Sequence, residues 1–113
     1  MIFAIDFDGT LCEHVYPEIG EPKACTINFI YDLKNKGHRW ILLTMREGVK
    51  LKEATDWLMQ YDLVPDCIND NVEELCCEFK NNPRKVFANA YIDDRNAGTV
   101  EQQIEFFRKE YDI

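Results

Sequence analysis

The sequence has little that would direct the protein to a membrane or out of the cell. Its apolar runs are short, such as Trp40 to Leu43, and none approaches the roughly 20 residues that a membrane-spanning helix needs. The chain begins with the apolar run MIFAI and then reaches Asp6, without the basic start and long apolar stretch typical of a signal peptide. We therefore expect no membrane association and a cytoplasmic location.

Ligands for a transition metal are also scarce. The five cysteines cannot all pair within one chain, and no Cys-x-x-Cys pair occurs. The two histidines, His14 and His38, are far in sequence from the adjacent Cys76 and Cys77. This pattern argues against a disulfide framework and against a zinc site, and it favours reduced cysteines that pack as small apolar residues.

Positively charged residues are also few. Lysine and arginine number 13 against 21 acidic residues, which gives a formal net charge of −8. An acidic surface repels nucleic acid and anionic membranes unless positive charge is concentrated locally, so a nucleic-acid partner is disfavoured without being excluded. Any anionic substrate would likewise have to approach a protein of its own sign.

What the sequence does contain is enough apolar material for one domain. It has 113 residues, of which 46% are hydrophobic. A chain of this size buries roughly two-thirds of its unfolded surface on folding. No internal repeat, low-complexity stretch or linker-like composition interrupts it, so we expect a single domain over residues 1–113.

Strand-like and helix-like segments alternate along the chain. Short apolar runs predict buried strands, and apolar residues at helical spacing predict helices. Strands are expected at 2–7, 39–44, 66–69 and 88–92, and helices at 22–37, 49–61, 71–80 and from Val100 to Tyr111. Because repeated strand–helix–strand units have right-handed crossovers, the order predicts an α/β fold, a three-layer Rossmann-like sandwich with a central parallel sheet.

Three of the expected strands end in side chains that can carry chemistry: Asp6 and Asp8, Thr44 and Arg46, and Asp93, Asp94 and Arg95. Ligands of open α/β sheets bind beyond the carboxyl ends of the strands. Two carboxylates about 4 Å apart repel by roughly 4 kcal/mol at an effective dielectric of 20, so four gathered there require a compensating cation. Oxygen ligands without histidine or cysteine favour Mg²⁺ over Zn²⁺.

The segment Asp6-Phe7-Asp8-Gly9-Thr10-Leu11 resembles the first motif of the haloacid dehalogenase-like (HAD) superfamily of phosphohydrolases and phosphotransferases. Further residues resemble the later motifs of that superfamily in the same order: Thr44 the second, Lys85 the third, and Asp93-Asp94 the fourth. The resemblance covers residues 6–94, and the sequence is similar to small bacterial members of about this size.

The resemblance implies a Mg²⁺-dependent phosphohydrolase that cleaves a phosphate monoester through an aspartyl-phosphate intermediate. Asp6 would be the nucleophile, and Asp8 would be the general acid that later activates water. The Asp6 side chain, the Asp8 backbone carbonyl and Asp93 would hold Mg²⁺, with Asp94 acting through water. The substrate would be a phosphorylated small molecule or macromolecule.

The resemblance also assigns phosphate binding to Thr44 and Lys85. Two alternatives stay open at this point, because Thr44 could be a helix cap and either Arg84 or Lys80 could supply the third-motif cation. Three more residues are candidates for substrate binding, and each could equally be an ordinary surface residue: His14, Arg46 and Arg95.

Predicted core helices fill both stretches where many relatives carry a cap domain, so we expect a capless chain. Its site would be open, or completed by a neighbouring subunit of a homo-oligomer. The sequence departs from the commoner fourth motif, because no third acid follows Asp93-Asp94 within five residues. The alternative function is a catalytically silent module that binds metal or phosphate as a regulatory or structural partner. A receiver-like phospho-acceptor domain fits less well, because there the paired acids come early in the chain.

Overall fold

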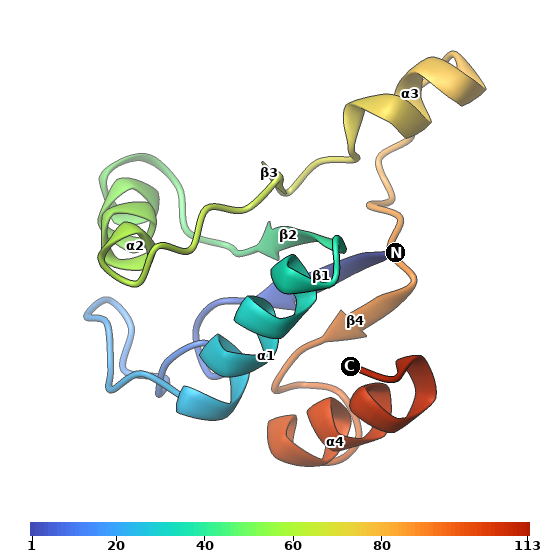
Figure 1. Ribbon diagram of the computed structural model, residues 1–113. Coiled ribbons are helices and arrows are strands. Elements are labelled where there is room, and N and C mark those ends of the chain that lie inside the picture. The colour runs from blue at the N-terminus through green and yellow to red at the C-terminus, as the bar shows by residue number, and fades with distance from the viewer.

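A computed structural model describes residues 1–113 and shows four strands alternating with four helices (Figure 1). The strands are β1 (Ile2–Asp6), β2 (Arg39–Leu43), β3 (Cys67–Ile68) and β4 (Ala90–Ile92). The helices are α1 (Ala24–Asn35), α2 (Gly48–Gln60), α3 (Glu73–Phe79) and α4 (Val100–Tyr111). Every expected element is present, and the α/β class with its parallel sheet is confirmed.

The order of the strands fixes where a ligand site can form. The sheet has the order β3-β2-β1-β4, and all of its strand pairs are parallel. The chain moves from β1 to β2 to β3 in one direction and then returns to place β4 on the other side of β1. The order therefore switches beside β1. Ile5 pairs with Ile92, so Asp6 and Asp93 follow at the same level on the carboxyl edge.

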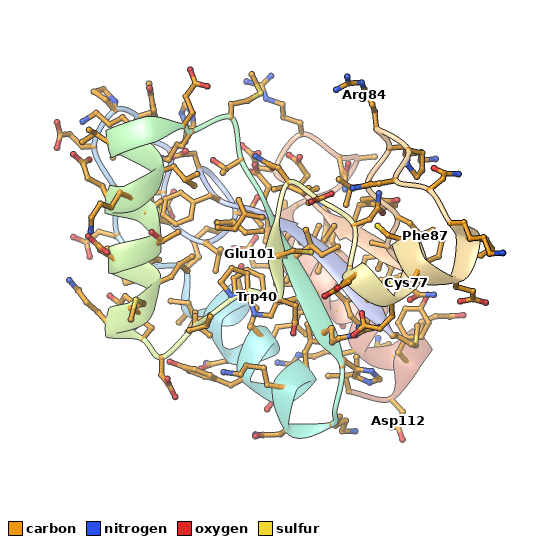
Figure 2. The ribbon with its side chains drawn as sticks, turned by 90° about the horizontal axis from the view of Figure 1, so that it is seen from above. Trp40, Cys77, Arg84, Phe87, Glu101 and Asp112 are labelled. Atoms are coloured by element: carbon orange, nitrogen blue, oxygen red, sulfur yellow. The ribbon has the colours of Figure 1, made fainter.

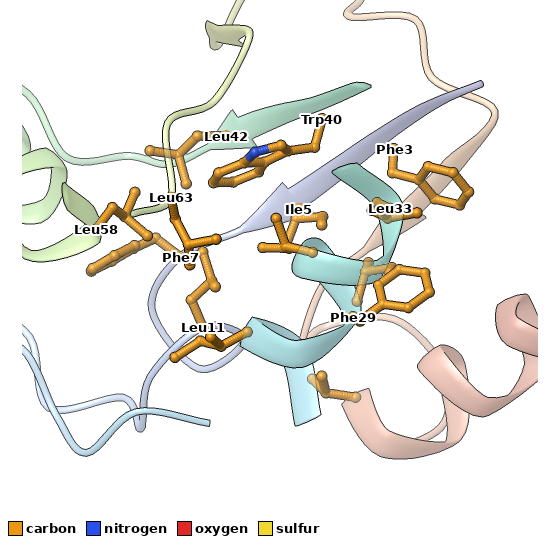
Figure 3. Packing of buried hydrophobic residues seen from close by; sticks show 14 of the residues in the cluster. Phe3, Ile5, Phe7, Leu11, Phe29, Leu33, Trp40, Leu42, Leu58 and Leu63 are labelled. Atoms are coloured by element: carbon orange, nitrogen blue, oxygen red, sulfur yellow. The ribbon is translucent and has the colours of Figure 1, made fainter. Parts of the chain in front are cut away.

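One face of the sheet carries the main core. Phe3 and Ile5 from β1 and Trp40 and Leu42 from β2 alternate onto this face and meet Leu33 of α1 (Figure 3). Helices α2 and α4 contribute buried residues to the same cluster. The intervening residues of β1 and β2 point to the opposite face and are buried there, so both faces of these strands are covered.

The opposite face is covered much more thinly. A small cluster there joins Ile2, Ala4 and Ile41 to Val72 and Ala88. The helix on this side, α3, has seven residues, none of them buried, and extends away from the sheet (Figure 1). The second helical layer of the expected three-layer sandwich is thus a single short helix with its loops, because β3 has only two residues and the chain turns back directly after it.

The segment around α3 is fastened to the amino ends of the strands. Arg39, the first residue of β2, makes a salt bridge of 2.6 Å with Glu74. Ile2 and Asn89 exchange two hydrogen bonds, one from the Ile2 N–H to Asn89 Oδ1 and one from the Asn89 N–H to the Ile2 carbonyl. Between these anchors Arg84 points outward (Figure 2). The two ends of this segment are thus held at the amino ends of β2 and β1, while its middle is tied to the residues after β3, because Asn71 Nδ2 donates to the carbonyls of Pro83 at 3.2 Å and Lys85 at 3.1 Å.

All five cysteines are free. Cys12 is buried in the main core, where it packs as a small apolar side chain. None of the four helices has the length and apolar character that crossing a membrane requires.

Candidate functional site

A cavity of about 410 Å³ opens at the carboxyl edge of the sheet, beside the switch in strand order. Its lining comes from the segments that follow β1, β2 and β4: Asp6, Asp8, His14, Tyr16, Thr44, Met45, Arg46, Asp93, Asp94 and Arg95. The three polar strand ends that the sequence singles out thus meet in one cavity, and of the candidate residues only Lys85 is missing from it.

Three carboxylates form the acidic part of this cavity. Oxygens of Asp6, Asp93 and Asp94 all lie within 4.8 Å of one another. Gly9 allows this approach, because it has a φ of +90° and a Cβ placed on it would lie 2.2 Å from Asp94 Oδ2. A larger residue at position 9 would therefore displace Asp94 and strain the turn after β1.

None of the three clustered carboxylates forms a salt bridge within the chain. Burial, followed by repulsion from Asp93, raises the pKa of Asp6 to about 7. Burial also raises the pKa of Asp93. The cavity is lined by four carboxylates and two guanidinium groups, which sum to −2 when all are ionised. One divalent cation would neutralise that charge.

Thr10 orients the first of these carboxylates. Its buried hydroxyl donates a hydrogen bond of 3.0 Å to Asp6 Oδ2 and accepts one of 3.0 Å from the Asp94 N–H. Its carbonyl accepts a hydrogen bond from the hydroxyl of Thr26 in α1. The role of Thr10 was not predicted from the sequence, although a hydroxyl four residues after Asp6, inside the Asp-Phe-Asp-Gly-Thr-Leu segment, was the available signal.

Asp8 points away from the acidic cluster and pairs with Arg46. Arg46 Nε donates to Asp8 Oδ2 and Nη2 donates to Asp8 Oδ1, each at 2.8 Å. Only 1% of the Arg46 side chain is exposed, against 15% for Asp8. The hydrogen bond with Asp8 raises the pKa of the Arg46 guanidinium above its ordinary value. The carboxylate of Asp8 is therefore separate from the group Asp6, Asp93 and Asp94, and Arg46 is a buried ion-pair partner.

Thr44 is held in place by Asn69, the residue that follows β3. Its N–H donates to Asn69 Oδ1 at 2.9 Å, and its carbonyl accepts from Asn69 Nδ2 at 2.8 Å. The Thr44 hydroxyl accepts a hydrogen bond from the Arg46 N–H at 3.0 Å, and the N-cap of α2 is Glu47. Thr44 thus stabilises the turn before α2, and its hydroxyl proton remains free to point into the cavity.

Arg95 and His14 lie at the mouth of the cavity. Both residues are exposed. The Arg95 N–H donates to Asp93 Oδ1 at 2.9 Å, while its guanidinium makes no salt bridge with any carboxylate of the chain. Arg95 is consequently the lining cation that is available to an anionic ligand.

Lys85 does not reach the cavity. It lies in the exposed segment between α3 and β4, where its carbonyl accepts a hydrogen bond of 3.1 Å from Asn71 Nδ2, and it is not among the residues that line the cavity. Arg84 and Lys80, the two alternatives, are exposed in the same segment and do not line the cavity either. In this arrangement none of these cations balances the charge of Asp6.

A second orienting residue comes from α4. Gln103 donates from Nε2 to the Asp93 carbonyl at 2.9 Å and accepts from the Asp93 N–H at 3.2 Å. It also accepts from Asn96 Nδ2 at 3.1 Å. The role of Gln103 was not predicted from the sequence, but this residue stands on the apolar stripe between Val100 and Phe107, where a polar side chain needs a partner.

Fold and site together define a Rossmann-like α/β protein with an acidic ligand cavity at the switch point of its sheet. Neither the family models nor the curated protein sequences match the chain. Among solved structures it is similar to a conserved protein of Bacteroides thetaiotaomicron, with 34% identity, a TM-score of 0.82, and coverage of 97% of this chain and 91% of the other. The chain belongs to the same family as that conserved protein.

Proposed function

We propose that the protein is a Mg²⁺-dependent phosphohydrolase that cleaves a phosphate monoester through an aspartyl-phosphate on Asp6. The observation that carries the proposal is the gathering of Asp6, Asp93 and Asp94 at the switch point, within 4.8 Å of one another and without a salt bridge to any cation of the chain. The likeness of the Asp-Phe-Asp-Gly-Thr-Leu segment to the first HAD motif gives these carboxylates their roles.

The residues present fit a hard divalent cation. The side-chain donors are all carboxylate oxygens, which Mg²⁺ prefers. The lining residues sum to a charge of −2, which one Mg²⁺ ion would neutralise. Asp6, Asp93 and Asp94 would hold it, together with the backbone carbonyl of Asp8. When bound, the ion would neutralise the carboxylates and the phosphoryl oxygens and so permit an anionic substrate to approach.

The chain's own residues then divide the reaction into two steps. The carboxylate of Asp6, oriented by Thr10, attacks phosphorus, and the bond to the leaving oxygen breaks as Asp8 delivers a proton to it. Asp8 next takes a proton from water, which attacks phosphorus and frees Asp6 and inorganic phosphate. The Thr44 hydroxyl and the exposed Arg95, which both line the cavity, would donate hydrogen bonds to the phosphoryl oxygens.

The cavity suits an accessible substrate. Core helices occupy the stretches between Asp8 and Thr44 and between Thr44 and Lys85, and we propose that no cap domain closes over the site. A volume of about 410 Å³ accommodates a phosphoryl group with a small leaving group. A phosphorylated macromolecule could present its phosphate from outside, and a second copy of the chain could cover the opening.

One observation favours the alternative, a catalytically silent module that binds metal or phosphate. Lys85 lies outside the cavity, so no lysine stands beside Asp6 to balance charge during phosphoryl transfer. A silent module should bind Mg²⁺ with the same three carboxylates and release no phosphate from any substrate.

The proposal is tested by phosphate release from p-nitrophenyl phosphate and from a panel of sugar phosphates and nucleotides with Mg²⁺. Turnover by the wild type should disappear with EDTA and in Asp6→Asn. It should persist in Glu110→Gln, which removes an exposed carboxylate of α4. Turnover that survives in Asp6→Asn would refute the nucleophile, and Mg²⁺ binding without hydrolysis of any compound would support the silent module.

A further inference from the structure

We propose that Arg46 is a positioning residue, which aims Asp8 at the cavity and fastens the loop of residues 13–20 to the site without binding substrate. The inference rests on the proposed phosphohydrolase function, in which Asp8 exchanges a proton with the leaving group. It reverses the simplest interpretation of an arginine beside a phosphate site, which is direct contact with the phosphate.

Every N–H of the Arg46 guanidinium already has an acceptor. Nε and one hydrogen of Nη2 bind the two oxygens of Asp8, and the other hydrogen of Nη2 binds the Glu18 carbonyl at 3.0 Å. Nη1 faces the carbonyls of Pro17 at 3.4 Å and Lys50 at 3.5 Å. A guanidinium group has five N–H donors, so none remains for a phosphate.

Arg46 is one of the residues that line the cavity, but aromatic rings cover its guanidinium. It lies between two aromatic rings, with Cζ 5.2 Å from the centre of Phe7 and 5.0 Å from the centre of Tyr16. Its side chain is 1% exposed. Arg95, by contrast, is exposed in the same cavity and makes no salt bridge, so the two arginines have different tasks.

The contacts of Arg46 join three separate parts of the site. Asp8 belongs to the turn after β1, Pro17 and Glu18 belong to the loop that carries His14 and Tyr16, and Lys50 belongs to the first turn of α2. Each carboxylate oxygen of Asp8 keeps a second lone-pair direction while it accepts from Arg46. Asp8 can therefore reach a leaving oxygen or a water molecule without giving up the arginine, and the fork of two bonds fixes its direction.

A double-mutant cycle in kcat/KM, with Mg²⁺ and both p-nitrophenyl phosphate and an alkyl phosphate, tests the assignment. Arg46→Met and Asp8→Asn should each lower kcat/KM about 100-fold. The loss should be larger for the alkyl phosphate, because its leaving group needs the proton from Asp8. If Arg46 acts through Asp8, adding Arg46→Met to Asp8→Asn should cost less than about threefold more. A further loss of about 100-fold would show direct action on substrate and overturn the proposal, as would unchanged activity in Arg46→Met.

Arg108→Met is the matched control, because Arg108 also pairs with an aspartate, Asp32 at 2.9 Å, and lies over a ring, Phe29 at 5.2 Å, but far from the cavity. It should lower the melting temperature and leave kcat/KM of the folded protein unchanged. Should Arg46→Met fail to fold, Arg46→Lys replaces it in the cycle, because an ammonium keeps the charge and loses the paired hydrogen bonds.

A cycle on melting temperature without substrate separates this inference from the proposed function. Losses in Arg46→Met and Asp8→Asn should be strongly non-additive, because each variant removes the same ion pair. Additive losses would overturn the inference. A wild type that releases no phosphate while the thermal cycle shows coupling would refute the phosphohydrolase and keep the Arg46 contact, now as part of a binding site.

Discussion

Replacing Asp6 by asparagine should stabilise the fold when no divalent cation is present. Asp6 faces Asp93 and Asp94 within 4.8 Å, and its carboxylate is partly buried. Asparagine has nearly the same shape, keeps an oxygen that can accept the hydrogen bond from Thr10, and carries no charge. The substitution thus removes the repulsion and leaves the packing intact.

The size of the effect follows from the pKa of Asp6, which is about 7 in the folded protein against 3.8 for an unperturbed aspartate. At about 1.4 kcal/mol for each tenfold change in proton affinity, ionised Asp6 opposes folding at pH 8 by about 4 kcal/mol before screening. Asp6 is only partly buried, so solvent screening reduces the expected gain to about 2 kcal/mol. In a domain of this size that gain raises the melting temperature by about 8 °C.

The effect should depend on pH with a definite sign. Because the folded-state pKa of Asp6 is raised above the unfolded value of 3.8, its contribution to stability is fully present below that value and is lost as the pH rises through about 7. Asparagine does not titrate. The variant should therefore melt close to the wild type at about pH 4 and well above it at about pH 8.

Differential scanning fluorimetry in EDTA and in Mg²⁺, over this pH range, is the assay. Mg²⁺ at 100 times its dissociation constant should stabilise the wild type by about 2.7 kcal/mol and should add little to Asp6→Asn, which reverses their order. Glu110→Gln also removes one negative charge, and it should behave as the wild type does, with no pH-dependent gain in EDTA and with the full stabilisation by Mg²⁺. The reasoning would be refuted if Asp6→Asn melted below the wild type in EDTA at pH 8. It would also be refuted if the difference in melting temperature between the two proteins were the same at both pH values.

Three further substitutions probe the packing around the site, each measured by urea unfolding. Gly9→Ala should destabilise the protein by about 2 kcal/mol and weaken Mg²⁺ binding in calorimetry, because the new Cβ meets Asp94 and φ is +90°. Thr10→Val should lose about 2 kcal/mol and lower kcat more than KM, because the valine keeps the volume and removes the hydrogen bonds to Asp6 and Asp94. Leu58→Ala, in the core, should lose about 3 kcal/mol and leave Mg²⁺ affinity unchanged.

Local patterns in the sequence were sufficient for the elements and for the acidic centre. An apolar run such as the one that opens the chain predicts a buried strand, and β1 is buried at Ile2, Phe3, Ala4 and Ile5. Once the sheet is parallel, the residues after β1 and β4 must share an edge. That β1 and β4 are neighbours, which brings Asp6 beside Asp93, comes from the strand order of the structure and was not predicted from the sequence.

Contacts between distant segments could not be predicted in this way. Nothing local distinguishes Arg46 from Arg95, since both follow strands beside acidic residues, and only the fold shows that Arg46 is buried against Asp8. The position of Lys85 was also beyond local patterns. It depends on the hydrogen bonds from Asn71 Nδ2 to the carbonyls of Pro83 and Lys85, which join residues 12 and 14 positions apart in the sequence.

The most direct test of the central claim is the search for a phosphoryl group on Asp6 itself. Wild-type protein and substrate are mixed with Mg²⁺, quenched in acid within one turnover, and digested for mass spectrometry. The account predicts a phosphorylated peptide that carries the modification on Asp6, is absent with EDTA, and still forms in Arg108→Met. Release of phosphate with no phosphoryl group on Asp6, or with the group on another residue, would contradict it.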